Sequence, residues 1–251
     1  MKGKKSLISK VGISFLVIIL IFALSFYAYT LDYSRALPQA IEKINNKNIL
    51  ESREGNLIKL KASGKEVDVG IIFYPGGKVD YKSYIPISEK IMEGGYDVFI
   101  VKMPFNLAVF NQDAADEIIK NNEEIKTWYL AGHSLGGAMA SIYASKNNAK
   151  VDGLILLAAY PSADFSESNI PIISIYGSND KVLNLKDLED KKSFASKETS
   201  YYVIEGGNHA YFGNYGEQKG DGKASITLSQ QQESAVSKIL DFIDKTNKGE
   251  I

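Results

Sequence analysis

The sequence lacks cysteine altogether and has only two histidines, His133 and His209, among its 251 residues. Without cysteine there are no disulfide bonds, no cysteine-ligated zinc or iron–sulfur sites and no cysteine nucleophile, although this absence leaves the cellular compartment open. Two histidines are too few for a His-rich metal site. A glycine-rich phosphate-binding loop of the P-loop or dinucleotide-binding type is missing as well. We therefore expect chemistry that uses side chains alone, with no cofactor and no metal ion.

An excess of charge is also missing, because 29 basic residues nearly balance 30 acidic ones and the formal net charge is −1. Such a chain has no overall field that attracts a polyanion, so we expect no nucleic-acid partner. Hydrophobic residues make up 45% of the sequence and charged residues 24%. Together with the length, this composition is typical of a globular protein with one α/β domain.

The N-terminal part of the chain differs from the rest in having a long apolar run. Residues 1–10 carry four lysines, and residues 11–31 (VGISFLVIILIFALSFYAYTL) contain no charged residue. A helix of that length spans about 30 Å, the thickness of the hydrocarbon core of a bilayer. Basic residues keep their side of such a helix in the cytoplasm. The pattern predicts a single-pass membrane anchor with residues 32–251 outside the cytoplasm.

A cleaved signal peptide is the alternative interpretation of the same segment. Ala23-Leu24-Ser25 offers a possible cleavage site, but the apolar region of a signal peptide is usually shorter, about 7–15 residues. Phe26, Tyr27 and Tyr29 are instead typical of the aromatic residues that hold a helix at the membrane interface. We favour the anchor. Both interpretations export the rest of the chain, which would be secreted if the segment were cleaved.

The remainder of the chain predicts one folded domain over residues 50–251, after a polar connector at 32–49. Residues 50–62 alternate apolar and polar around Glu54-Gly55-Asn56, which predicts a short hairpin. Beyond residue 66, apolar strands alternate with helices, a pattern typical of a mostly parallel sheet with helices on both faces. The expected strands are 67–74, 96–101, 128–131, 151–158, 170–176 and 200–204. The expected helices are 81–93, 112–125, 135–145, 184–195 and 228–245.

The motif Gly132-His133-Ser134-Leu135-Gly136 lies between a predicted strand and a predicted helix. In a G-x-S-x-G turn of this kind, the serine backbone is strained and lifts the hydroxyl above the sheet, while the two glycines allow close approach of the chain. Ser134 is therefore our candidate nucleophile.

A serine hydroxyl needs a neighbouring base, and the base needs an acid that orients it. His133 is unsuitable, because adjacent side chains in a sharp turn point away from each other. His209 follows the last predicted strand and is the candidate base. Asp180 follows the strand at 170–176 and is the candidate acid, with Asp164 as its rival. All of these positions lie at the ends of strands, where ligands gather in parallel sheets.

Stabilisation of an oxyanion needs two backbone donors aimed at the developing charge. The N–H of Leu135, at the start of the helix after Ser134, is one candidate. The other should come from the loop after the strand at 67–74, where Pro75-Gly76-Gly77 lets the backbone approach a substrate. Gly77 is the first choice and Gly76 the second.

The chain order Ser134, Asp180, His209 on alternating strands and helices resembles the α/β-hydrolase superfamily over roughly residues 50–247. Within it, the chain looks like a compact, membrane-associated branch close to dienelactone-hydrolase-like proteins. The resemblance implies the fold and an ester-cleaving activity, but dienelactone hydrolases proper use a cysteine where this chain has Ser134. The motifs that carry it are Tyr74-Pro75-Gly76-Gly77-Lys78, Gly132-His133-Ser134-Leu135-Gly136-Gly137, Gly177-Ser178-Asn179-Asp180 and Gly207-Asn208-His209. The segment from Ala210 to Ala224 also has the look of that branch, and we expect it to shape the rim of the site.

The predicted site should be open, because only residues 159–169 separate two of its strands and leave no room for a helical lid. An open site favours small-molecule or surface-exposed acyl esters over lipids held under a lid. Thioesterase, peptidase and acyltransferase chemistry on the same residues remain alternatives, as does a non-catalytic binding module on the same scaffold. Four tyrosines are candidates for the rim: Tyr74, Tyr160, Tyr211 and Tyr215.

Overall fold

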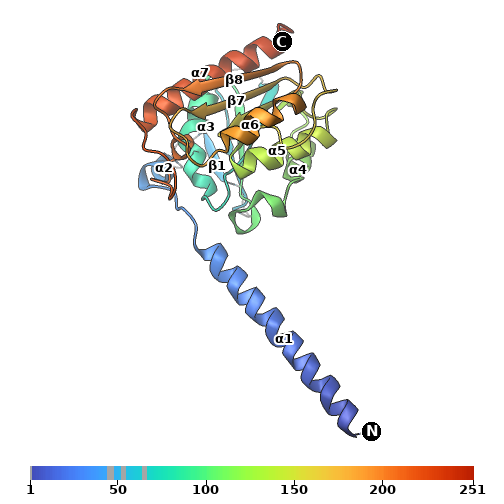
Figure 1. Cartoon of the computed structure of the whole chain (residues 1–251). Helices are drawn as coiled ribbons and strands as arrows, with labels where there is room; N and C mark the ends of the chain where they lie inside the picture. Colours follow the sequence, from blue (N-terminus) through green and yellow to red (C-terminus); the bar gives the residue numbers. More distant parts are fainter. Residues whose placement is uncertain (1, 44–47, 52–54, 64–66) are drawn as a thin grey trace. The chain divides into compact units, whose positions relative to one another are not determined.

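The computed structural model describes residues 2–43, 48–51, 55–63 and 67–251, with side chains from residue 11 onward. The chain forms two compact units, residues 1–33 and 34–251. The first unit is one continuous helix, α1 (Lys2–Leu31), drawn in blue in Figure 1. Its segment Val11–Leu31 is long and apolar enough to cross a membrane, as the sequence predicts. A signal sequence has the same properties.

The second unit contains an eight-stranded sheet in the order β1-β2-β4-β3-β5-β6-β7-β8. The strands from β3 to β8 are parallel, and β2 joins the edge of β4 in the antiparallel sense, with β1 outside it. The predicted mostly parallel sheet is confirmed. The strands are β1 (Ile49–Glu51), β2 (Leu57–Leu60), β3 (Val69–Tyr74), β4 (Asp97–Val101), β5 (Thr127–His133), β6 (Gly153–Leu157), β7 (Ile172–Gly177) and β8 (Thr199–Ile204).

Helices cover both faces of the sheet (Figure 1). On one face α3 and α7 pack against each other, and residues of both helices lie in one apolar core with residues of the strands. On the other face, residues of α4 and α5 lie in a second apolar core. The central strands are apolar along nearly their whole length because both faces of the sheet are buried in this way. The helices are α2 (Pro38–Glu42), α3 (Ile85–Glu93), α4 (Ala114–Lys120), α5 (Leu135–Lys146), α6 (Leu185–Asp190) and α7 (Leu228–Asn247). Short 3₁₀ turns are η2 (Tyr81–Tyr84), η3 (Pro104–Asn106), η4 (Ala108–Phe110), η5 (Lys191–Phe194) and η6 (Ala210–Phe212).

The predicted hairpin over residues 50–62 corresponds to β1 and β2, which pair antiparallel with Leu50 opposite Lys59. Part of its expected turn, at residues 52–54, lies outside the described residues. The compact unit already begins at Ser34, which forms an isolated parallel bridge with Val79. Residues that the sequence indicates as a connector therefore belong in part to the folded unit.

The connection between β6 and β7 has neither a helix nor a strand, and every residue of it is described. This agrees with the expected absence of a helical lid. The carboxyl ends of β3, β5, β7 and β8 lie along one edge of the sheet, because these strands are parallel. They bring the loops that contain Gly77, Ser134, Asp180 and His209 to the same end of the domain.

Candidate active site

Ser134 occupies a strained turn between β5 and α5, with φ 51° and ψ −121°. A non-glycine residue with positive φ is uncommon and costs about 1–3 kcal/mol, so the surrounding structure must hold it there. A hydrogen bond from Ser134 N to Leu157 O (2.9 Å) fixes the turn against β6. The end of β5 and the start of α5 approach each other so closely that a Cβ on Gly132 would lie 2.5 Å from the backbone of Gly136. Only glycine fits at position 132.

Asp180 and His209 form a hydrogen-bonded pair that is nearly fully buried. His209 Nδ1 lies 2.8 Å from Asp180 Oδ2. The other carboxylate oxygen, Asp180 Oδ1, accepts hydrogen bonds from the N–H groups of Val182 and Leu183, both at 2.8 Å. These bonds hold the carboxylate so that it accepts the Nδ1 proton, and they leave His209 Nε2 as the acceptor nitrogen. Among the described residues, Nε2 has no hydrogen-bond partner.

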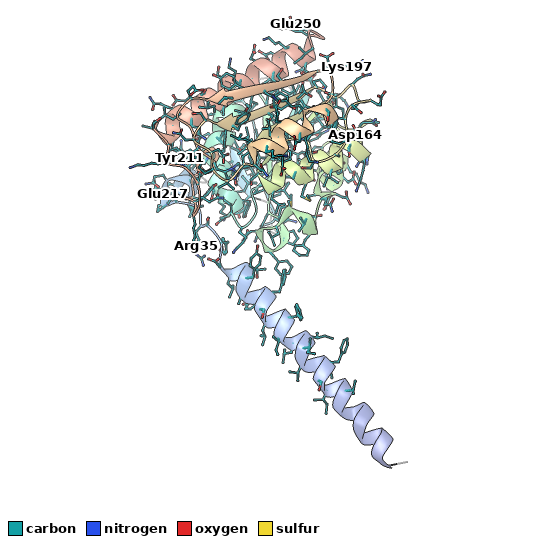
Figure 2. All side chains as sticks on the ribbon, viewed as in Figure 1. Arg35, Asp164, Lys197, Tyr211, Glu217 and Glu250 are labelled. Atoms are coloured by element: carbon teal, nitrogen blue, oxygen red, sulfur yellow. The ribbon has the colours of Figure 1, made fainter. Side chains whose placement is uncertain are left out.

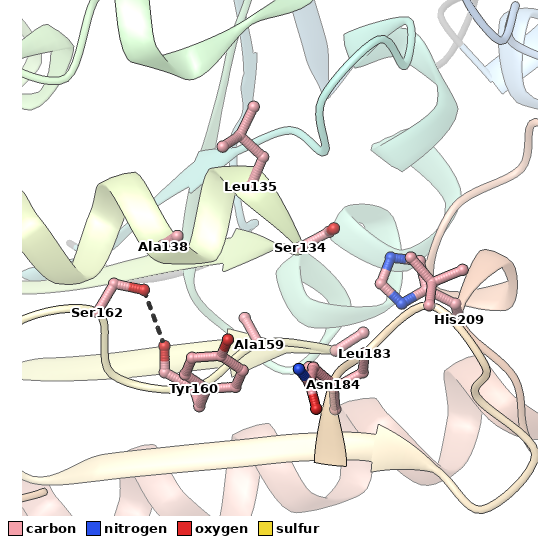
Figure 3. Close-up of a pocket in the computed structure, with 11 residues that line it drawn as sticks. Ser134, Leu135, Ala138, Ala159, Tyr160, Ser162, Leu183, Asn184 and His209 are labelled. Atoms are coloured by element: carbon pink, nitrogen blue, oxygen red, sulfur yellow. Dashed lines mark hydrogen bonds between the residues drawn. The ribbon is translucent and has the colours of Figure 1, made fainter. Parts of the chain in front are cut away.

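Ser134 and His209 both line a cavity of about 290 Å³ at this edge of the sheet. Figure 3 shows the Ser134 hydroxyl pointing toward the end of the cavity where the His209 ring lies. The other walls come from α5, the end of β6 and the loop after β7. The other lining residues are Leu135, Ala138, Ala158, Ala159, Tyr160, Ser162, Val182, Leu183 and Asn184.

Asp164, the rival acid, is exposed and lies away from this cavity. Its carboxylate accepts a hydrogen bond from the N–H of Ser166 (2.9 Å), as in an ordinary Asx turn. Figure 2 shows Asp164 on the opposite flank of the domain from Tyr211, which follows His209 by two residues. The geometry therefore brings Asp180, and not Asp164, to the histidine.

The two candidate oxyanion donors on the loop after β3 have different surroundings. The N–H of Gly76 donates to the Tyr84 hydroxyl at 3.0 Å, in a buried hydrogen bond. Gly77 lies against Leu135, since a Cβ on Gly77 would be 2.8 Å from Leu135 Cδ2. The N–H of Gly76 is thus already engaged, which favours Gly77 with Leu135 as the donor pair.

His133 sits beneath the turn and takes part in a chain of buried hydrogen bonds instead of facing the cavity. Its Nδ1 lies 2.9 Å from the Tyr84 hydroxyl and its Nε2 lies 3.1 Å from the carbonyl oxygen of His209. Because Tyr84 accepts a bond from Gly76, its own O–H donates to Nδ1, and Nε2–H then donates to His209 O. Burial and the neighbouring His209 hold the pKa of His133 well below its ordinary 6.5, so the ring is neutral.

Tyr84 lies within the helix predicted at 81–93, and the sequence pattern assigned it no role in the site. Of the four tyrosines considered for the rim, Tyr160 lines the cavity, whereas Tyr74 is fully buried and donates to Gln112 O. Within the described part of the chain, no group of three or more His, Asp or Glu side chains is arranged to hold a metal ion.

A family model described as "Alpha/beta hydrolase family" matches residues 70–233, more than half of the chain. No curated protein matches significantly. Among solved structures, Est1E from Butyrivibrio proteoclasticus has a TM-score of 0.57 at 16% identity, over 79% of this chain and 100% of that one. A monoacylglycerol lipase from Paleococcus ferrophilus has a TM-score of 0.57 at 12% identity, over 74% and 99%.

An alpha-beta serine hydrolase homologue from Coxiella burnetii has a TM-score of 0.55 at 17% identity, covering 77% of this chain and 97% of that one. At such low identities these likenesses establish the fold alone, and the family model adds the membership. The match spans the loop after β3, the Ser134 turn and the Asp180–His209 pair. The chain is a member of the alpha/beta hydrolase family.

Proposed function

We propose that this protein is a serine hydrolase that cleaves carboxylic esters through an acyl-enzyme intermediate. The observation that carries the proposal is the buried Asp180–His209 pair. His209 lines the same cavity as the strained Ser134, and its Nε2 has no hydrogen-bond partner among the described residues. An activated serine needs an oriented base of this kind within reach of its hydroxyl.

In the proposed mechanism, His209 Nε2 takes the proton of the Ser134 hydroxyl as the oxygen attacks the ester carbonyl. Asp180 keeps the Nδ1 proton in place and stabilises the imidazolium that forms. The N–H groups of Leu135 and Gly77 donate to the oxyanion. His209 then gives its proton to the leaving alkoxide, the acyl group stays on Ser134, and water activated by His209 releases the acid.

The cavity favours small, uncharged acyl groups. Its volume of about 290 Å³ lies just below the usual range for small-molecule sites, about 300–1,000 Å³. None of its eleven lining residues is Asp, Glu, Lys or Arg, and three are alanines next to the nucleophile: Ala138, Ala158 and Ala159. A charged acyl group would find no Asp, Glu, Lys or Arg side chain there to pair with.

The names of two structural neighbours agree with an ester substrate. Est1E has been solved with ferulic acid bound, and the Paleococcus protein is described as a monoacylglycerol lipase. Thioesterase, peptidase or acyltransferase chemistry would use the same three residues, because the acyl donor and acceptor are chosen by contacts at the rim. A non-catalytic binding module on this scaffold is the alternative from a different class.

We further propose that residues 11–31 anchor the enzyme in the cell membrane with the catalytic domain outside the cytoplasm. The proposal is supported by the length and apolarity of the segment and by the lysines before it. The substrate would then be an ester that reaches the outer side of the membrane.

The decisive kinetic test is Ser134→Ala in the full-length protein, assayed with p-nitrophenyl esters of increasing acyl length. We expect kcat to fall about 10⁶-fold, the scale observed when a triad nucleophile is removed. Ser162→Ala is the matched control, because Ser162 lines the same cavity and its hydroxyl, the group that the change removes, donates only to the Tyr160 carbonyl (Figure 3). Ester hydrolysis that survives Ser134→Ala and is lost in Ser162→Ala would refute the assignment.

A further inference from the structure

The loop after η6 returns to the site and crosses both loops that hold the acid and the base. Its residues Asp221-Gly222-Lys223 form what we call the strap. Gly222 packs directly on the backbone next to Asp180, since a Cβ added to it would lie 1.8 Å from Asn179 O. Such close packing tolerates only glycine at position 222, and it fixes the distance between the strap and the loop after β7.

The strap is hydrogen-bonded to both neighbours of His209. Ala210 N, on the C-terminal side of the histidine, donates to Asp221 Oδ2 at 2.9 Å. On the N-terminal side, Asn208 Nδ2 donates to Gly222 O at 3.0 Å. Asn208 is itself buried and held by Gln231 of α7, whose side chain bonds both its N–H (2.9 Å) and its carbonyl (2.7 Å).

The strap is bonded in the same way to both neighbours of Asp180. Lys181 N donates to Asp221 Oδ1 at 3.3 Å, and Asn179 Nδ2 donates to Lys223 O at 3.1 Å. The two oxygens of one carboxylate thus bind the residue after the acid and the residue after the base. Gly222 N donates to Oδ1 as well (2.7 Å), which fixes the orientation of the carboxylate.

We propose that Asp221 is a positioning residue that sets the distance and angle between Asp180 and His209. The two partners lie on loops after different strands. Two hydrogen bonds join these loops ahead of the pair, Asn179 N to Gly207 O and Gly206 N to Ser178 Oγ (both 2.8 Å), and Asp221 joins them on the other side, beyond Asp180 and His209. A carboxylate that accepts N–H groups from both loops joins them through charge-assisted hydrogen bonds, which are stronger than neutral ones. This role rests on the proposed function, because it matters to chemistry only if His209 is the base.

The test compares Asp221→Asn with wild type in the full-length protein in detergent micelles. An amide has only one acceptor oxygen, and its NH₂ group would face the N–H of the other loop. We expect the rate of labelling of Ser134 by a fluorophosphonate, and kcat for an ester, to fall about 100-fold, the scale of a misplacement of about 1 Å. KM should stay unchanged, because no strap residue lines the substrate cavity.

A proton resonance gives a second readout that does not depend on activity. The Nδ1 proton shared by His209 and Asp180 should give a far-downfield NMR signal in wild type, and this signal should broaden or vanish in Asp221→Asn at temperatures where the variant is folded. Glu217→Gln removes a carboxylate from an exposed position of the same loop, and Lys223→Ala keeps the carbonyl that the strap uses. Both controls should match wild type.

If the labelling rate of Ser134 and the downfield proton signal are both unchanged in Asp221→Asn, Asp221 is not a positioning residue. A wild-type protein that does not label would contradict the proposed function, whereas the NMR comparison would still decide the role of the strap. If Asp221→Asn does not fold, Asn179→Ala replaces it, because this change removes only the exposed bond to Lys223 O. A decrease in the labelling rate of Asn179→Ala that is smaller than the decrease expected for Asp221→Asn would support the positioning role of the strap. A labelling rate equal to that of wild type would overturn it.

Discussion

Five non-glycine residues in the described part of the chain have positive φ, and three of them follow strands that end near Ser134. Ser134, Ala158 and Lys78 all have positive φ values, of 51°, 46° and 57°. They follow β5, β6 and β3, respectively, at the edge of the sheet where the cavity lies. Each such residue costs about 1–3 kcal/mol relative to a relaxed conformation. Packing and hydrogen bonds hold these residues in the strained conformation. One of these bonds joins Ala158 N to Ile175 O (2.8 Å).

The assignment of the acid predicts different outcomes for two aspartates. Asp180→Asn should reduce kcat about 10⁴-fold, because the amide no longer holds the histidine in the productive tautomer. Asp164→Asn should leave kcat unchanged, since Asp164 is exposed and bonds only within its own turn. Steady-state kinetics of the two variants with one ester checks the prediction. A large loss in Asp164→Asn, with Asp180→Asn active, would reverse the assignment.

The residues that meet at the cavity were largely predictable from the sequence, because each follows a strand and belongs to a short motif. Ser134 has flanking glycines, and His209 is the one histidine outside that turn. Tyr84 and Asp221 were not predictable. Their roles depend on hydrogen bonds to residues distant in the chain, and neither has a local signature. For Tyr84 the partner is His133, 49 positions away.

At the scale of elements, the buried chain Gly76–Tyr84–His133–His209 connects four segments of the fold. It joins the loop after β3, η2, the end of β5 and the loop after β8. Burial raises the pKa of Tyr84, so its hydroxyl keeps the proton that it donates to His133. The candidate oxyanion loop and the backbone of the candidate base are thereby held in one polar network.

The neutral state of His133 predicts a pH dependence of stability. The pKa of His133 is lowered in the folded protein, whereas an unfolded histidine titrates near 6.5. Below that pH the unfolded chain binds one proton more than the folded chain, so the free energy of unfolding decreases as the pH falls. The decrease from this one group has a limiting slope of about 1.4 kcal/mol per pH unit.

The contribution of His133 to the free energy of unfolding can be measured by denaturant unfolding of wild type and His133→Gln between pH 7.5 and 4.5. This range extends about one unit above 6.5 and about two units below it. Glutamine offers both a donor and an acceptor but does not titrate. The variant should lose stability more slowly than wild type as the pH falls below 6.5. Parallel curves for the two proteins would show that His133 is not the group responsible.

Most elements were predicted at nearly their observed positions, because continuous apolar strands and Gly-ended helices are strong local signals. The helix predicted at 81–93 is instead divided into η2 and α3. Pro86 explains the break, since proline is well tolerated only in the first turn of a helix and α3 begins at Ile85. The helix predicted at 112–125 is shorter in the structure. α4 ends at Lys120, before Asn121 and Asn122.

At the scale of the whole molecule, the proposed anchor predicts where the enzyme is found. Full-length protein expressed in a bacterium should sediment with membranes and resist extraction at alkaline pH, because an anchor of 21 uncharged, mostly apolar residues would stay in the bilayer. Protease added to the outer side of the cytoplasmic membrane should digest the domain after residue 32. A soluble mature protein that begins near Phe26 would show that the segment is a cleaved signal peptide.

If Ser134 is a nucleophile activated by His209, it should react covalently with an electrophile that mimics an ester. Folded full-length protein is treated with a fluorophosphonate, and the adduct is mapped by peptide mass spectrometry. We predict a single adduct on the peptide that contains Ser134, lost in Ser134→Ala and strongly slowed in His209→Gln. No adduct on the folded wild-type protein, or an adduct on another serine that persists in Ser134→Ala, would show that Ser134 is not the activated nucleophile.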